Sequence, residues 1–214
     1  MGRDRGDDRF SVDVAGSTVT RFVEPVVLTG REFVRLEPLT AGDVAEIATA
    51  AADGDAGRLW FTVAPSPDTA ESWVRRMLAL QQVGGLTFVV RRPDGEALGS
   101  SSYLNVDADN RRLEIGATWY AASARRTGVN AECKLLMLGH AFEVLGCVAV
   151  EFRTHFFNST SRAAIERLGA KLDGVLRSHQ LLPDGSRRDT AVYSILDIEW
   201  PAVRNNLEFR LGRR

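Results

Sequence analysis

A strand–helix–strand unit between residues 111 and 155 constrains the fold of this chain more than any other feature. Residues 111–120 predict a strand, and residues 131–145 carry Leu135, Leu138 and Phe142 at helical spacing. Residues 147–155 begin with a near-continuous apolar run, which is typical of a strand buried on both faces. Strands joined through a helix in one sheet run parallel, so we expect a parallel pair here.

Turn signals predict antiparallel hairpins on either side of this unit. One turn is Pro93-Asp94-Gly95 and the other is Pro183-Asp184-Gly185, each between two strand-like segments. The pattern predicts an α+β fold in one domain, with a mixed, mostly antiparallel sheet flanked by helices. Two short strands are expected around residues 29–30, and further helices at 40–52, 69–82 and 159–168.

The charge balance excludes some classes of protein. The 27 basic and 28 acidic side chains give a formal net charge of −1, whereas a protein that coats nucleic acid needs a dominant basic field. No apolar run approaches the ~20 residues that span a membrane, and the charged start lacks the apolar segment of a signal peptide. Cys133 and Cys147 are too few for a four-thiolate metal site. We therefore expect a cytoplasmic protein with no nucleic-acid, membrane or metal partner.

The ends of the chain differ in composition from its middle. Residues 1–22 are rich in Asp, Arg, Gly and Ser, which is typical of a flexible N-terminal tail. The folded domain is expected at residues 23–200, and residues 201–214 are expected to form a C-terminal extension.

The loop at residues 125–130 lies between a predicted strand and a predicted helix and has the features of an anion site. A helix start leaves backbone N–H groups unpaired and carries a partial positive charge, which suits a pyrophosphate. Gly128 lets the backbone approach a ligand closely, and Arg125 and Arg126 lie beside it. A plain loop before a capped helix is the alternative, and the loop contains neither a P-loop nor a GxGxxG motif.

This loop resembles the acyl-CoA signature of the GCN5-related N-acetyltransferases (the GNAT superfamily), Arg/Gln-x-x-Gly-x-Gly/Ala, with Arg125 and Gly128 in register. Asn130 replaces the final small residue, and Arg126 stands where a glycine is usual. Over residues 26–200 the chain is similar to the branch of the ribosomal-protein-alanine N-acetyltransferases (RimJ/RimL-like). Further family motifs follow in order: Glu114-Ile115-Gly116, Trp119, Glu132, Asn158-x-x-Ser161-Arg162, Leu168-Gly169-Ala170, Asp173-Gly174-Val175-Leu176-Arg177, Arg188-Asp189 and Glu199-Trp200.

The resemblance implies how an acyl-CoA would be held. Backbone amides of residues 126–130 would bind its pyrophosphate, and the strand end at 119–120 would border its pantetheine arm. Residues 117–119 are one residue longer than the commonest family spacing, which predicts a β-bulge that splays this strand from the one at 147–155. The residues expected to contact the cofactor are Trp119, Tyr120, Arg125, Arg126, Thr127, Gly128, Val129, Asn130 and Asn158.

Acetyl transfer needs a neutral amine, a stabilised oxyanion and a proton for the departing thiolate. By the resemblance, Glu114 is the candidate base, directly or through water, and Ser161 is the candidate general acid. Alternatively, Glu114 is a solvated or arginine-paired strand residue and Ser161 a residue of the helix cap. Asn158 either contacts CoA or caps the same helix, and His155 either faces the cleft or is a hydrogen-bonded strand residue.

The sequence thus predicts an enzyme that moves an acetyl group from acetyl-CoA to a primary amine, of a small molecule or a peptide, by direct attack in a ternary complex. Two alternatives stay open: a transferase for a longer acyl-CoA, and an acyl-CoA-binding sensor or interaction module without catalysis. Homodimers are common in this family, but no sequence feature demonstrates one here.

Overall fold

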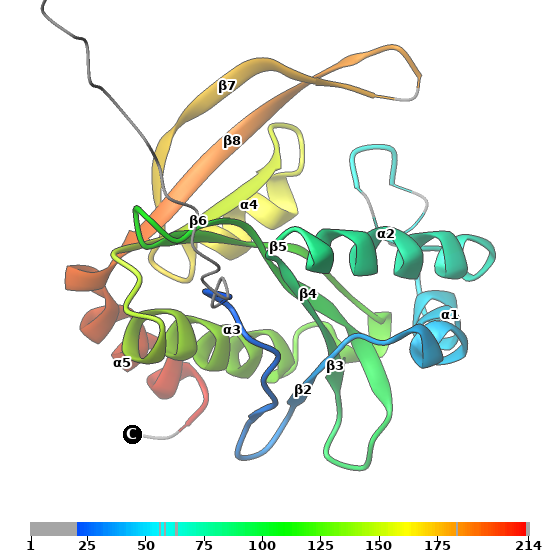
Figure 1. Cartoon of the computed structure of the whole chain (residues 1–214), viewed down its shortest axis with the longest axis horizontal. Helices are drawn as coiled ribbons and strands as arrows, with labels where there is room; N and C mark the ends of the chain where they lie inside the picture. Colours follow the sequence, from blue (N-terminus) through cyan, green and yellow to red (C-terminus); the bar gives the residue numbers. More distant parts are fainter. Residues whose placement is uncertain (1–20, 56, 58, 63, 183, 213–214) are drawn as a thin grey trace, which may run out of the picture.

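One sheet of eight strands organises the molecule (Figure 1). The computed structural model describes residues 21–212 except residues 56, 58, 63 and 183, so the expected N-terminal tail lies almost wholly outside the described residues. Among the described strands β5 and β6 alone pair in parallel, and they are joined through α3, as predicted. The order is β1 (Leu28–Thr29), β2 (Arg35–Pro38), β3 (Leu86–Arg91), β4 (Ala97–Asp107), β5 (Arg112–Tyr120), β6 (Ala149–His155), β8 (Arg187–Leu196) and β7 (Lys171–Leu181).

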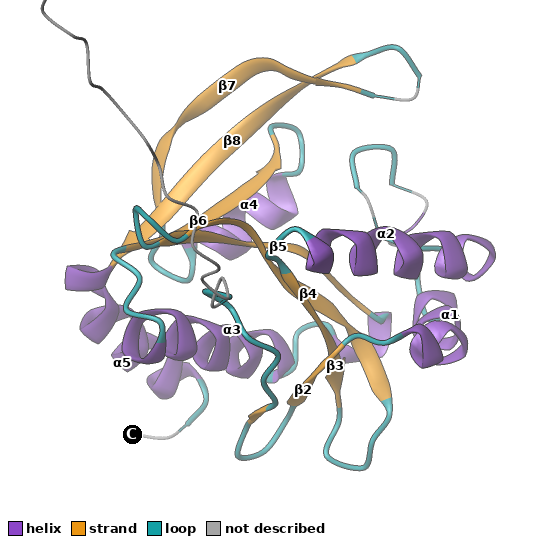
Figure 2. Ribbon diagram, viewed as in Figure 1, coloured by secondary structure: helices purple, strands orange, loops and turns teal. Residues whose placement is uncertain are grey.

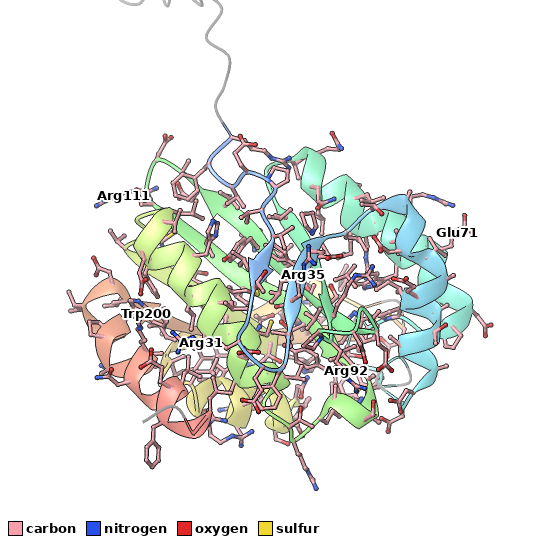
Figure 3. The ribbon with its side chains drawn as sticks, turned by 90° about the horizontal axis from the view of Figure 1, so that it is seen from below. Arg31, Arg35, Glu71, Arg92, Arg111 and Trp200 are labelled. Carbon is pink, nitrogen blue, oxygen red and sulfur yellow. The ribbon has the colours of Figure 1, made fainter. Side chains whose placement is uncertain are left out.

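Helices cover both faces of the sheet, which confirms the α+β prediction (Figure 2). Two of them, α1 and α2, share a core with Val89 of β3 and Trp119 of β5. On the opposite face α3 and α5 share a larger core with Phe88 and Val90, and Figure 3 shows the two helix pairs on opposite sides of β2. The α-helices are α1 (Val44–Ala52), α2 (Ala70–Gln82), α3 (Val129–Gly139), α4 (Ser159–Glu166) and α5 (Trp200–Arg210).

The helix predicted at residues 131–145 is longer and less regular than its pattern suggests. It begins at Val129, continues past Gly139 as a π-helical turn over His140–Val144, and stops before Gly146, whose φ is 67°. Its fully buried side carries Cys133, Lys134, Met137 and Leu138, whereas Leu135 and Phe142 are only partly buried. Of the three predicted apolar residues, Leu138 is therefore the one that is fully buried, whereas Phe142 packs against Trp200 of α5.

Residues 201–210, expected as part of an extension, form most of α5 and belong to the core. Val203 and Leu207 are buried against the α3 side of the sheet. The Trp200 ring stacks on Phe142 with 5.6 Å between centroids, and its Nε1 donates to Glu143. Figure 3 shows Trp200 at the junction of α5 and α3.

The β7–β8 hairpin reaches beyond the rest of the sheet (Figure 1). β8 pairs with β6 along the whole of β6, from Ala149↔Leu196 to His155↔Thr190. Among the described residues, positions 187–189 of β8 pair with no strand on the β6 side. This part of the hairpin borders the region where the candidate site lies.

Candidate active site

β5 and β6 separate early, as predicted. Their ladder ends at the pair Glu114↔Glu151 after three residue pairs. Beyond it β5 carries a bulge, because Ser102 pairs with Gly116 whereas Ser100 pairs with Trp119. Ala117, within the bulge, has a φ of 47°. A bulge bends its strand, so β5 turns away from β6 and leaves a slot between the two strands.

The loop before α3 presents unpaired backbone amides. Within the described residues, the N–H groups of Arg126, Thr127 and Gly128 have no hydrogen-bond acceptor. Thr127 shapes the loop, since its Oγ1 donates to the Ala124 carbonyl (2.7 Å) and accepts from the Val129 N–H (3.2 Å). Arg126 has a φ of 61°, the left-handed conformation that glycine adopts most easily. Arg126 therefore has a conformation that suits glycine at a position where the family pattern has a glycine.

A close packing contact fixes Gly128. The Phe33 ring occupies the space into which a Cβ at position 128 would project. Phe33 itself belongs to the loop between β1 and β2, which the buried carboxylate of Glu132 binds. Its Oε1 accepts from the Arg31 N–H (2.8 Å) and its Oε2 from the Val34 N–H (2.9 Å). Figure 3 shows Arg31 in this loop beside α3.

Three residues expected at the cofactor use their side chains elsewhere. The Trp119 ring packs edge-on against Trp73, 5.9 Å between centroids, in the core below α1 and α2. Arg125 forms an ion pair of 3.4 Å with Asp55. The Tyr120 hydroxyl is buried, and burial raises the pKa of Tyr120 well above its usual value. What Trp119 and Arg125 can offer a ligand is therefore mainly their backbone.

Glu114 lies at the end of the short β5–β6 ladder and is buried, with 6% of its surface exposed. Its Oε2 accepts a hydrogen bond of 2.6 Å from Nδ2 of Asn105 and lies 3.6 Å from Nε of Arg153. Burial raises the pKa of the Glu114 carboxyl above its ordinary value, although Asn105 and Arg153 act in the opposite direction. A raised pKa makes a carboxylate a stronger base near neutral pH.

Glu114 opens onto a cavity of about 280 Å³, which has room for a small ligand or one side chain. The cavity lies between α2, the bulged strand β5 and the β7–β8 hairpin. Strands on both sides of the β5–β6 ladder therefore contribute to it. Arg153 is ion-paired with Glu151, whose Oε2 lies 2.8 Å from Nη2 of Arg153. The lining residues are Arg76, Met77, Leu80, Leu104, Asn105, Glu114, Ala117, Arg153, His179, Gln180, Arg188 and Thr190.

Asn158 and Ser161 lie at the start of α4 and do not line this cavity. The Asn158 side chain caps the helix, since its Oδ1 accepts from the Ser161 N–H at 3.0 Å. Its Nδ2 and the Ser161 hydroxyl have no hydrogen bond to another described residue, so both remain able to bind a ligand.

His155, at the end of β6, is buried by aromatic rings. Trp60 meets it edge-on at 4.9 Å between centroids, and Phe157 stacks on it at 5.7 Å. Its Nδ1 accepts from the Phe157 N–H, which assigns the proton of the neutral ring to Nε2. Burial lowers the pKa of His155, so the neutral ring is favoured. Nε2 has no partner among the described residues, and His155 can donate a hydrogen bond but not act as a base through Nε2.

Lys134, which the sequence analysis did not single out, is a buried cation next to the bulge. Its Nζ donates to Oγ of Ser101 and Oγ1 of Thr118, both at 2.9 Å. The lysine thereby ties α3 to the two strands on either side of the bulge. Burial lowers the pKa of Lys134. A helical wheel could have indicated this, because Lys134 lies on the same face as Leu138, which is buried too.

Other site types find no support in the described residues. Burial raises the pKa of Cys133, which disfavours its thiolate as a nucleophile. No group of three or more metal-ligating side chains occurs among these residues. No helix in the part of the chain that the structure describes is long and apolar enough to cross a membrane.

Comparisons with known proteins agree with this architecture. Residues 34–171 match the acetyltransferase (GNAT) domain. The protein YdaF of Bacillus subtilis (strain 168), which is named for ribosomal N-acetyltransferase activity, is 32% identical over 151 residues, covering 66% of this chain and 78% of YdaF. A GCN5-related N-acetyltransferase from Brucella melitensis is 30% identical with a TM-score of 0.78, and the match covers 87% of this chain and 86% of that one.

The fold is also similar to that of RimJ from Mycobacterium smegmatis, solved in complex with CoA-disulfide, at 22% identity and a TM-score of 0.71 over 88% of this chain and 96% of RimJ. The chain therefore belongs to the GNAT family of acyl-CoA-dependent N-acetyltransferases.

Proposed function

We propose that this protein transfers the acetyl group of acetyl-CoA to a primary amine, of a peptide N-terminus or a small molecule, by direct attack in a ternary complex. One observation carries the proposal: a buried carboxylate, Glu114, lies where the β5–β6 ladder ends and opens onto a cavity. The donor slot and the acceptor cavity therefore meet at one potential base. The name of YdaF supports a ribosomal peptide as the acceptor.

The residues present fit an acyl-CoA. Unpaired amides at Arg126, Thr127 and Gly128 suit a pyrophosphate, and the N-terminus of α3 adds a partial positive charge. Val129 and Asn130 follow in the first turn of α3, where the Val129 N–H is held by Oγ1 of Thr127. The bulge at Ala117 lies beyond the last β5–β6 pair, where the extended arm of the cofactor would run between the two strands. Bound acetyl-CoA would supply an activated acetyl thioester.

Glu114 would accept a proton from the attacking amine. Acetyl transfer requires a neutral nitrogen, whereas a primary amine is mostly protonated at neutral pH. The raised pKa of Glu114 brings the carboxylate closer to that task. The hydrogen bond from Asn105 orients the carboxylate and keeps part of it ionised.

Ser161 would protonate the departing thiolate, and Asn158 would contact the cofactor through its Nδ2. Neither group is used by another described residue in a side-chain hydrogen bond that would compete with these roles. The backbone of Trp119 and Tyr120 would border the arm of the cofactor, with Arg125 beside the loop.

Thiol release from acetyl-CoA with pooled amine acceptors tests the proposal. We expect release that depends on acceptor, and a loss of about 10²-fold or more in turnover for Glu114→Gln with acetyl-CoA binding retained. Arg112→Gln, on the same face of β5 but outside the cavity, is the matched control. CoA binding without thiol release under any acceptor favours a sensor, and release from longer acyl-CoA alone identifies another donor.

A further inference from the structure

The charges of the cavity are unequal. Three arginines and one carboxylate contribute to its described lining: Arg76, Arg153, Arg188 and Glu114. Arg153 is neutralised by Glu151 and Glu114, at 2.8 Å and 3.6 Å. Arg153 is therefore balanced by its neighbours, and the lining charge that remains to be explained is that of Arg188.

Arg188 is the arginine whose charge is least compensated. Its guanidinium forms no ion pair within 4.0 Å with another described residue, and its Nε is buried with no hydrogen-bond acceptor among them. Burial lowers the pKa of Arg188, while the more distant charge of Glu114 raises it. A desolvated guanidinium with a free N–H is costly to keep unless an anion binds it.

Glu114 and Arg188 thus form two opposite poles in one cavity. Glu114 comes from the centre of the sheet and Arg188 from the β7–β8 hairpin, and the two are too far apart for an ion pair. We infer that Arg188 binds an anionic group of the acceptor, so that the acceptor is a primary amine bearing a carboxylate close to its reacting nitrogen; this rests on the acetyl transfer proposed above.

The same charges select against other amines. A polyamine or an aminoglycoside brings further positive charge towards Arg188, and like charges in a partly buried site are strongly unfavourable. A zwitterion, in contrast, matches the field between Glu114 and Arg188. His179 and Gln180, on the same hairpin, offer further hydrogen-bonding groups at that end of the cavity.

Two matched pairs of acceptors test this inference and separate the sources of the carboxylate. Serine and serinamide differ at the α-carboxylate, whereas the peptide amides Ser-Asp-Ala and Ser-Asn-Ala differ at the second side chain. Both pairs, with spermidine, are assayed for thiol release and, independently of turnover, for binding by calorimetry in the presence of CoA. Serinamide has the less basic amine, so any bias from basicity works against the expected preference.

We expect the carboxylate-bearing member of at least one pair to be preferred by about tenfold or more in kcat/KM and in Kd. The preferred pair then identifies a free amino acid or an acidic peptide as the source. Arg188→Gln should remove the preference, and Arg188→Lys should retain part of it because the charge remains. Arg187→Gln makes the same change of charge on an exposed neighbour that faces the other side of β8, and should retain the whole preference.

Equal binding and turnover within both pairs would overturn the inference while leaving acetyl transfer intact. A preference for spermidine, or a preference that survives Arg188→Gln, would also overturn it. If no acceptor releases thiol but the anionic members still bind more tightly through Arg188, the proposed function fails and the anion site stands.

Discussion

Nδ2 of Asn105, on β4, lies 2.6 Å from Oε2 of Glu114, on β5, and holds the carboxylate at the edge of the cavity. Asn105 has a φ of 46°, a conformation that asparagine tolerates better than most residues. One residue thus supplies both the unusual backbone of β4 near its end and the direct partner of the potential base.

Replacing Asn105 by glycine should shift the pH dependence of the enzyme. Glycine accepts the same backbone conformation, so the variant removes the hydrogen bond with little strain. That bond lowers the pKa of Glu114, so its loss raises the pKa further, and kcat/KM begins to fall at a higher pH as the solution is acidified. We expect a roughly 3- to 10-fold loss on the acidic side of the profile that is recovered at higher pH. Asn105→Asp should shift the profile further, and superimposable profiles would contradict this role.

Gly128→Ala should weaken CoA binding through Phe33. The added Cβ overlaps the Phe33 ring, so the loop or the ring must move, at a cost of ~1–3 kcal/mol in the free energy of unfolding. The displaced amides should raise KM for acetyl-CoA. The double variant Gly128→Ala/Phe33→Ala makes room for the Cβ and should regain CoA affinity; if it does not, the contact is not the reason for the glycine.

Glu132→Gln should destabilise the protein by ~2–4 kcal/mol, measured by urea denaturation. The buried carboxylate accepts backbone N–H groups at both oxygens, including those of Arg31 and Val34. A glutamine presents one NH₂ group instead, so part of this set loses its acceptor. Glu143→Gln is the matched control, because the exposed Glu143 accepts from Trp200 and an amide oxygen can do the same. Equal, small losses in the two variants would show that the Glu132 carboxylate contributes little to the free energy of unfolding.

Lys134→Met should leave the protein as stable as before or more stable, because a buried charge is replaced by a side chain of similar size while Ser101 and Thr118 stay bonded to each other at 2.7 Å. The pKa of Lys134 is lowered in the folded state. Between that lowered pKa and the ordinary value of 10.5 the unfolded chain binds more protons, so this group makes the free energy of unfolding rise with pH.

The variant should lack this alkaline rise, as urea titrations at several pH values would reveal. Lys171→Met changes an exposed lysine on β7, and this variant should keep the alkaline rise in the free energy of unfolding. A large loss of stability in Lys134→Met at every pH would mean instead that the ammonium group holds the bulge together.

Local patterns predicted the elements well because they depend on neighbours in sequence. The hairpin turns, the parallel β5–β6 pair and the bulge near Ala117 were all predicted. The partner of Glu132 was not, since the residues that it binds lie 98 or more positions away. Arg188 was noted only within a family motif, because its isolation depends on which groups the hairpin brings near it.

Candidate residues were harder to assign than elements, for the same reason. The resemblance placed Trp119 and Tyr120 beside the cofactor, but a motif does not say that the Trp119 ring is directed into the core against Trp73. The two readings of Asn158 were open because capping and ligand binding favour the same residue type; its Oδ1 caps the helix.

The short β5–β6 ladder divides the sheet into two parts, β1 to β5 and β6 to β8. Two half-sheets are joined along that ladder over three residue pairs, so a small rotation of one against the other pivots there. Such a rotation would change the separation of the two strands most near Tyr120 and His155 and least at Glu114. The potential base therefore lies at the joint, where a rotation of this kind would displace it least.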